Sequence, residues 1–125
     1  DRLRDRLLAN RILRQVELMT IAGSRAGGLS PALVAANLAA LRRAAELDPT
    51  EVGIPLARGG QYLLLRRPEA ALEAYREALA IEPRPEIFLN QARAYHLAGD
   101  TARSREALER THRLDPMLAA RSGIP

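Results

Sequence analysis

The 125-residue chain contains no cysteine, no lysine and no tryptophan, and only one phenylalanine. Without cysteine, structural disulfides, thiolate catalysis and cysteine-ligated zinc are excluded, and the redox compartment stays open. No apolar run approaches the roughly 18 residues of a membrane-spanning helix, so the sequence predicts no transmembrane segment. Cytoplasmic and extracytoplasmic locations both stay open. Because the chain begins at Asp1 and not at Met, an upstream signal peptide, lipid anchor or further domain is left open too.

The abundant residues favour helices. Alanine occurs 23 times and leucine 21 times, and both are strong helix formers. With so few aromatic residues, such helices must pack largely through small side chains. Composition therefore predicts an all-α protein, and 125 residues are enough for one domain with its own core.

The basic charge is carried by nineteen arginines, and the net charge is +4. Residues 1–17 hold five arginines against three acids, residues 18–83 seven against seven, and residues 84–125 seven against five. A surface that follows phosphates usually gathers its charge on one face, whereas this excess is divided between two ends. Arginine-mediated nucleic-acid binding is therefore the weakest alternative. Coding rich in G and C explains the arginine bias without it.

Three segments end with an apolar residue, an acidic residue and a proline. The prolines Pro49, Pro83 and Pro116 lie 34 and 33 residues apart. Each follows an amphipathic pattern that proline cannot continue, because it has no N–H and its ring clashes with the preceding turn. The sequence therefore predicts three helical hairpins with a common ending.

Before each proline, spacings of four, three and five place a small, a large and another small residue on one helical stripe. In the helix before, a small residue stands three positions ahead of a tyrosine. The series are Gly59, Tyr62, Ala71, Tyr75, Ala78 and Pro83; Ala92, Tyr95, Ser104, Leu108, Thr111 and Pro116; and, for the second helix alone, Asn37, Leu41, Ala44 and Pro49.

On these residues the sequence resembles the tetratricopeptide repeat (TPR) family, whose period is 34 residues. The resemblance implies an all-α fold, a right-handed α-solenoid of antiparallel helical hairpins with about six helices. It divides the chain into a degenerate hairpin with a long first helix (1–50), two TPR-like repeats (51–84 and 85–116) and a C-terminal tail (117–125). We expect helices over residues 2–24, 31–47, 51–66, 69–81, 85–98 and 101–114.

Local signals support the first two of these helices. Ser30 is the predicted N-cap of the second helix and Pro31 its first residue, where the missing N–H costs nothing. The first helix is expected to turn an apolar face toward the second. That face consists of Leu8, Ile12, Val16 and Met19.

No set of residues predicts catalysis. His96 and His112 are the only histidines, and neither lies in a metal-binding spacing, so both are interpreted as structural or surface residues. The glycine-rich run from Gly23 to Gly28 has no preceding strand and no Gly-Lys-Ser/Thr, so it is interpreted as a loop between helices. We expect no catalytic residue, no metal and no cofactor.

The resemblance implies a concave groove lined by the first helix of each pair. The groove residues expected from the repeat 51–84 form an apolar strip, and those from the repeat 85–116 include polar and basic side chains. Such a groove suits an amphipathic helix or extended segment with an acidic flank. The alternative is that the long first helix covers Leu56, Leu63 and Leu89. For a clamp that binds the C-terminal carboxylate of a partner, the groove offers only Asn90 and Arg93. The predicted partner-binding residues are Leu56, Gly60, Leu63, Leu64, Leu89, Asn90, Arg93 and His96.

Together these features predict a non-catalytic protein–protein interaction module or scaffold subunit. Its partner is expected to be a protein or peptide, within a larger assembly or outside one. The alternative is a regulatory or docking domain of a longer enzyme or of a membrane-associated protein attached through a missing N-terminal segment.

Overall fold

The computed structural model describes residues 1–124, which form seven helices and no strand. The predicted all-α stack of helical hairpins is confirmed, and the six expected helices lie within two residues of their predicted bounds. None of these helices combines the length and apolarity needed to cross a bilayer. The helices are α1 (Arg2–Arg25), α2 (Pro31–Leu47), α3 (Gly53–Leu64), α4 (Pro68–Ile81), α5 (Pro85–Leu97), α6 (Thr101–Leu114) and α7 (Pro116–Ala120).

Helix α7 lies where the sequence predicted only a tail over residues 117–125, whose last residue is outside the described range. The side chain of Asp115 accepts a 3.1 Å hydrogen bond from the backbone N–H of Leu118. Pro116 occupies the first helical position, as Pro31 does in α2 after the cap by Ser30. The same start signal therefore operates at both helices.

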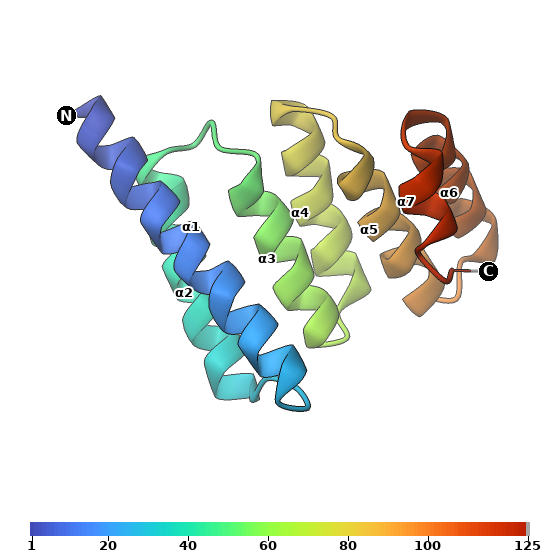
Figure 1. Ribbon diagram of the computed structural model, residues 1–125, viewed down its shortest axis with the longest axis horizontal. Helices are drawn as coiled ribbons and strands as arrows, with labels where there is room; N and C mark the ends of the chain where they lie inside the picture. Colours follow the sequence, from blue (N-terminus) through green and yellow to red (C-terminus); the bar gives the residue numbers. More distant parts are fainter. Residues whose placement is uncertain (125) are drawn as a thin grey trace.

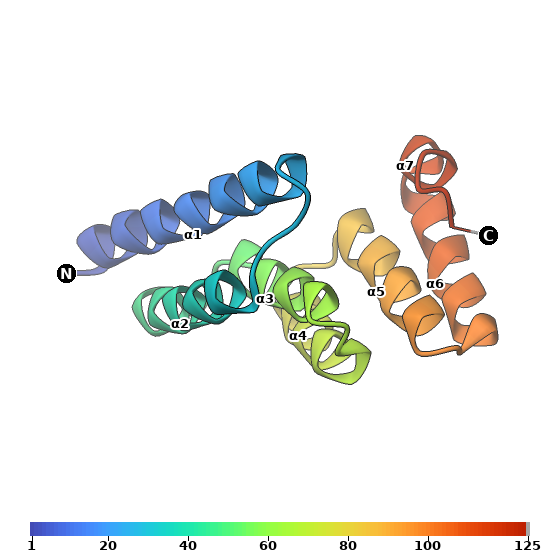
Figure 2. The ribbon, with the colours of Figure 1, turned by 90° about the horizontal axis from the view of Figure 1, so that it is seen from below.

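The helices stack in two rows. Each helix packs against the next one in the chain, and α1, α3, α5 and α7 also contact one another in succession. Within residues 1–124, α2, α4 and α6 make no comparable contacts with each other. Figure 1 shows the first row in front of the second, with the two termini at opposite ends. Seen from below in Figure 2, the first row forms an arch that opens between α1 and α7.

The repeat pattern forms the interior. Ala71, Tyr75 and Ala78 are fully buried between α3, α4 and α5, together with Val52 and Ile87. A second apolar cluster joins the first hairpin to α3. It contains Ala9, Leu13, Val16, Leu41, Ala44 and Ile54. Since small residues alternate with large ones in both clusters, neighbouring helices approach closely.

The buried face of α1 differs from the predicted one. Leu8 and Met19 are exposed, whereas Ala9 and Leu13 are buried beside Val16. The reason is that α1 packs against α3 as well as α2, so its contact face points between two helices. A face chosen for one partner helix was therefore misplaced by a fraction of a turn.

Candidate interaction groove

A groove with a volume of about 370 Å³ lies between α1 and α3. Its α3 wall is formed by residues three or four apart, which occupy one side of the helix. Its α1 wall comes from the last turns of that helix. The lining residues are Val16, Glu17, Thr20, Ile21, Gly53, Leu56, Ala57, Gly60, Gln61 and Leu64.

Two adjacent glycines of α3 have different roles. A Cβ atom at Gly59 would overlap the ring of Tyr75, so this glycine allows α3 and α4 to approach. A Cβ atom at Gly60 would meet nothing within 4 Å, so this glycine keeps the groove open. One residue therefore serves the core and its neighbour serves the surface, because successive positions on a helix face different directions.

A chain of polar side chains lies beneath the groove. The Asn37 amide nitrogen donates a 3.1 Å hydrogen bond to Oε1 of Gln61. The Gln61 amide nitrogen donates in turn to the hydroxyl of Thr20 at 3.0 Å, and that hydroxyl donates to the Val16 carbonyl at 2.8 Å. Buried polar groups must be satisfied in this way or destabilise the fold. This series of hydrogen bonds ties α1, α2 and α3 together at the groove floor.

The eight predicted partner-binding residues are only partly brought together. Leu56, Gly60 and Leu64 line the groove, and Leu64 is 44% exposed. Leu63 is half-buried and packs against the core cluster of α3, α4 and α5. Leu89 is only 4% exposed and therefore offers almost no surface to a partner. Its helix, α5, packs against four others, which explains how that face becomes covered.

The three polar predictions lie on α5, beside the groove and not within its lining. Asn90 accepts a 2.9 Å hydrogen bond from a guanidinium nitrogen of Arg93. Arg93 and His96 are exposed. His112 is exposed as well, and no group of three potential metal ligands occurs among residues 1–124.

Sequence reasoning missed the α1 wall of the groove. It considered α1 only as a cover over Leu56, Leu63 and Leu89, whereas α1 forms one side of an open groove. The available signal was Ile21, an apolar residue outside the stripe assigned to the core, which is half exposed at the groove.

A larger hollow, about 580 Å³, lies between α6 and α7. Opposite charges meet in its lining, where Arg105 and Arg113 lie with Glu109. Arg113 also approaches Glu109 at 3.9 Å on the same helix. Its apolar residues are Leu108 on α6 and Ala119 and Ala120 on α7, and it differs from the groove between α1 and α3 in having three charged residues in its lining, where the groove has only Glu17.

No family model matches the chain, and no curated protein shows significant similarity to it. Among solved structures, the fold is similar to a thermophilic TPR protein from Thermus thermophilus. The two are 24% identical with a TM-score of 0.66, over 73% of this chain and 50% of that chain. The fold therefore defines the class, an α-helical repeat protein. Within that class, the arrangement of the helices is similar to that of this TPR protein, and the likeness concerns the fold alone.

Proposed function

We propose that the chain is a protein-interaction module that binds a peptide segment or partner helix in the groove between α1 and α3. One observation carries the proposal: Leu56, Leu64 and Ile21 surround an open space beside Gly60 instead of closing on each other. Apolar surface of this kind at a groove is stabilised when a partner covers it.

Arg93 and His96 on α5 extend the proposal to the charge of the partner. Because α5 contacts α3, these exposed groups lie on the helix next to the apolar strip. A partner with apolar residues in the groove and an acidic flank over α5 would match both surfaces. The module binds and does not catalyse in this proposal, either as an adaptor of its own or as the docking part of a longer protein.

The test is capture of partners from the source cell by cross-linking and mass spectrometry, with the native chain and three variants. Leu64→Glu places a charge at the groove, and Gly60→Leu fills it where a side chain has room. Leu114→Glu is the matched control, because Leu114 is also an exposed leucine but lies at the end of α6. All three variants should show unchanged helical circular dichroism.

The expected result is a set of proteins that the native chain and Leu114→Glu capture and that both groove variants lose. Identical sets from all four forms would remove the groove from the proposed function. The mass of the polypeptide in the source cell separates the remaining forms of the proposal. A mass near 13.7 kDa identifies an adaptor, and a larger mass a docking domain.

A further inference from the structure

The outer face of α1 carries a line of residues at the spacing of a coiled-coil seam. From Leu7 onward the successive spacings are four, three, four and three, which average the 3.5-residue repeat that lets two helices pack along each other, and Leu3 lies four residues before Leu7 on the same face. We call this line the α1 seam. It consists of Leu3, Leu7, Arg11, Arg14, Leu18 and Ile21.

The α1 seam has no partner within residues 1–124. Helix α1 contacts only α2 and α3, through the opposite face that contains Ala9, Leu13 and Val16. The apolar residues of the seam are left in solvent: Leu3 is 65%, Leu7 61%, Leu18 56% and Ile21 50% exposed. Exposed apolar residues are ordinary when they are scattered, but a line of them at helical spacing is a feature of interaction sites.

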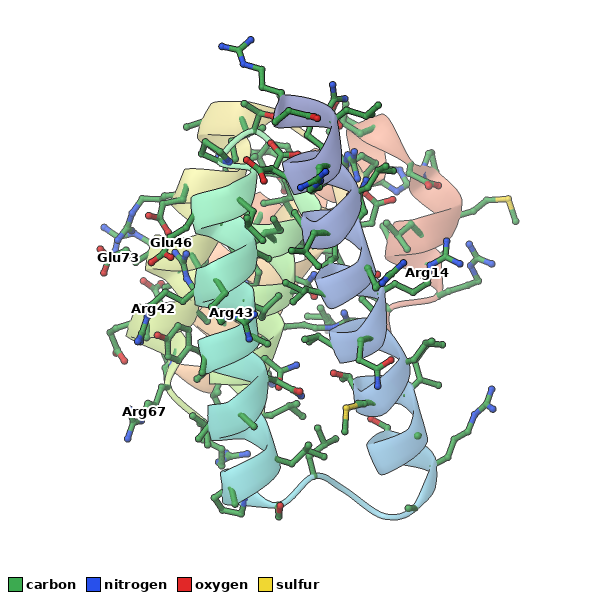
Figure 3. All side chains as sticks on the ribbon, turned by 90° about the vertical axis from the view of Figure 1, so that its left-hand side faces the viewer. Arg14, Arg42, Arg43, Glu46, Arg67 and Glu73 are labelled. Atoms are coloured by element: carbon green, nitrogen blue, oxygen red, sulfur yellow. The ribbon has the colours of Figure 1, made fainter. Side chains whose placement is uncertain are left out.

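The charge of the seam identifies what fits it. Apolar residues occupy both ends, two arginines occupy the centre, and no acidic residue belongs to it. Nearby, on the outer side of α2 and α4, Arg42 and Arg43 are accompanied by Glu46 and Glu73 (Figure 3). The same view shows Arg14 on the side of α1 away from α2. Asp1, which lines a hollow together with Leu7 and Arg11, and Glu17, three residues after Arg14, lie beside the line and not in it, so the seam itself is basic at its centre.

We propose that the α1 seam docks an amphipathic helix of another protein, with apolar residues toward both ends and Asp or Glu at its centre. The seam from Leu3 to Ile21 is about 27 Å long at a rise of about 1.5 Å per residue, so the partner helix has about five turns. Carboxylates at its centre would form charge-assisted hydrogen bonds with Arg11 and Arg14. Central charged positions of this type select the partner and its register.

A second copy of the chain does not meet these requirements. A parallel pair of seams would place Arg11 against Arg11, and an antiparallel pair would place Arg11 against Arg14, so like charges would meet in both cases. An anionic lipid surface fits less well too. Helices that lie in a membrane interface keep their basic residues at the flanks, whereas Arg14 lies between Leu7 and Leu18 on the midline.

This inference does not depend on the proposed groove. Only Ile21 belongs to both surfaces, and the remaining seam residues lie outside the groove lining. The two surfaces can therefore be tested separately in the full chain, with Arg11 and Arg14 reporting on the seam and Leu64 on the groove.

The experiment measures the binding of two synthetic helical peptides, each about five turns long, by fluorescence anisotropy. Both carry leucine at the outer seam positions, and they differ only in having glutamate or arginine at the two central ones. The native chain is expected to bind the glutamate peptide at least about tenfold more tightly. The charge-reversed variant, Arg11→Glu with Arg14→Glu, is expected to prefer the arginine peptide, and Leu64→Glu is expected to behave as the native chain does.

A neutral variant, Arg11→Gln with Arg14→Gln, should bind both peptides with similar affinity, and it serves if the reversed variant does not fold. The proposal is overturned if neither peptide binds, or if the preference of the native chain persists in the neutral and reversed variants. The proposal would also be overturned if sedimentation showed that the native chain dimerises through Leu7. Preferential binding to phosphatidylserine vesicles over the glutamate peptide would overturn it too.

Discussion

The amide nitrogen of Asn37 donates a 3.1 Å hydrogen bond to Oε1 of Gln61, and both side chains are buried. Asn37 lies on α2 and Gln61 on α3, so the bond joins the first helical hairpin to the second. A TPR-like stripe has a small residue at the position of Asn37. The polar replacement is accommodated because Gln61 supplies the missing partner and passes the bond on to Thr20.

Asn37→Ala should therefore lower the free energy of unfolding by about 1–3 kcal/mol, because it leaves the buried Gln61 oxygen without its donor. Chemical denaturation followed by circular dichroism measures the change. Asn10→Ala is the control, since Asn10 lies exposed on α1 and should change stability by less than about 0.5 kcal/mol. Equal effects of the two substitutions would contradict a structural role for the buried bond.

The adjacent glycines of α3 should respond in opposite directions to the same substitution. Gly59→Ala should lower stability by about 1–3 kcal/mol, because its methyl group collides with the Tyr75 ring in a packed interior. Gly60→Ala should raise stability by about 0.5–1 kcal/mol, because alanine is the better helix former and has free space there. Thermal unfolding of both variants tests the pair. A gain in stability at Gly59 would show that the contact with Tyr75 is not tight.

Tyr75→Phe should stabilise the chain by about 1 kcal/mol, because a buried hydroxyl without a partner costs free energy that the phenyl ring does not. Tyr75 is fully buried, and its hydroxyl has no hydrogen-bond partner among residues 1–124. Tyr62→Phe is the matched control on α3, where the side chain is only half-buried. Urea titrations of the two variants decide the matter, and a loss of stability in Tyr75→Phe would reveal a partner for the hydroxyl.

Stability should also fall in alkaline solution through Tyr75. Burial raises the pKa of this phenol above its ordinary value, so the folded chain keeps a proton that the unfolded chain releases. The contribution is complete below about pH 10, the usual pKa of tyrosine, and is lost as the pH rises further, by at most about 1.4 kcal/mol per pH unit. Unfolding measured between pH 8 and 11, values chosen as about two units below and one above that pKa, should show this slope. Tyr75→Phe should reduce it.

Much of the fold was predictable because the residues that begin and end its helices act locally. Pro31 and Pro85 begin helices, Pro49 and Pro116 follow them, and Gly27 lies in the connection after α1 with a positive φ of 103°. Helix α7 was missed although Asp115 and Pro116 repeat the start signal of α2, because a five-residue helix has no periodicity to detect.

The departures from the repeat pattern became clear only in three dimensions. Ser104 and Thr111 occupy positions where the TPR pattern that the sequence resembles has alanine, and both are buried. The Ser104 hydroxyl donates to the Ala92 carbonyl at 2.9 Å, and the Thr111 hydroxyl donates to the Ala107 carbonyl at 3.0 Å. A helix carbonyl can accept a second hydrogen bond, so these hydroxyls are satisfied within small spaces.

The groove was less predictable than the core. Leu56, Gly60 and Leu64 were found from repeat positions, because those positions fix which side of α3 faces away from α4. The burial of Leu89 and the contribution of Ile21 to the groove depend on how neighbouring helices pack, and local periodicity does not carry that information. Sequence alone therefore identified one wall of the groove.

Helix α3 joins the first hairpin's apolar cluster through Ile54, while Val52 just before it belongs to the other cluster. Opening the first hairpin would therefore uncover one side of α3 and leave its other side packed. Amide hydrogen exchange should accordingly be fastest in α1 and reach α3 only in rarer, larger openings. A molecule that bridged α1 and α3 would slow exchange in the whole first hairpin, so the rate at which that end unzips would report occupancy without any label on the partner.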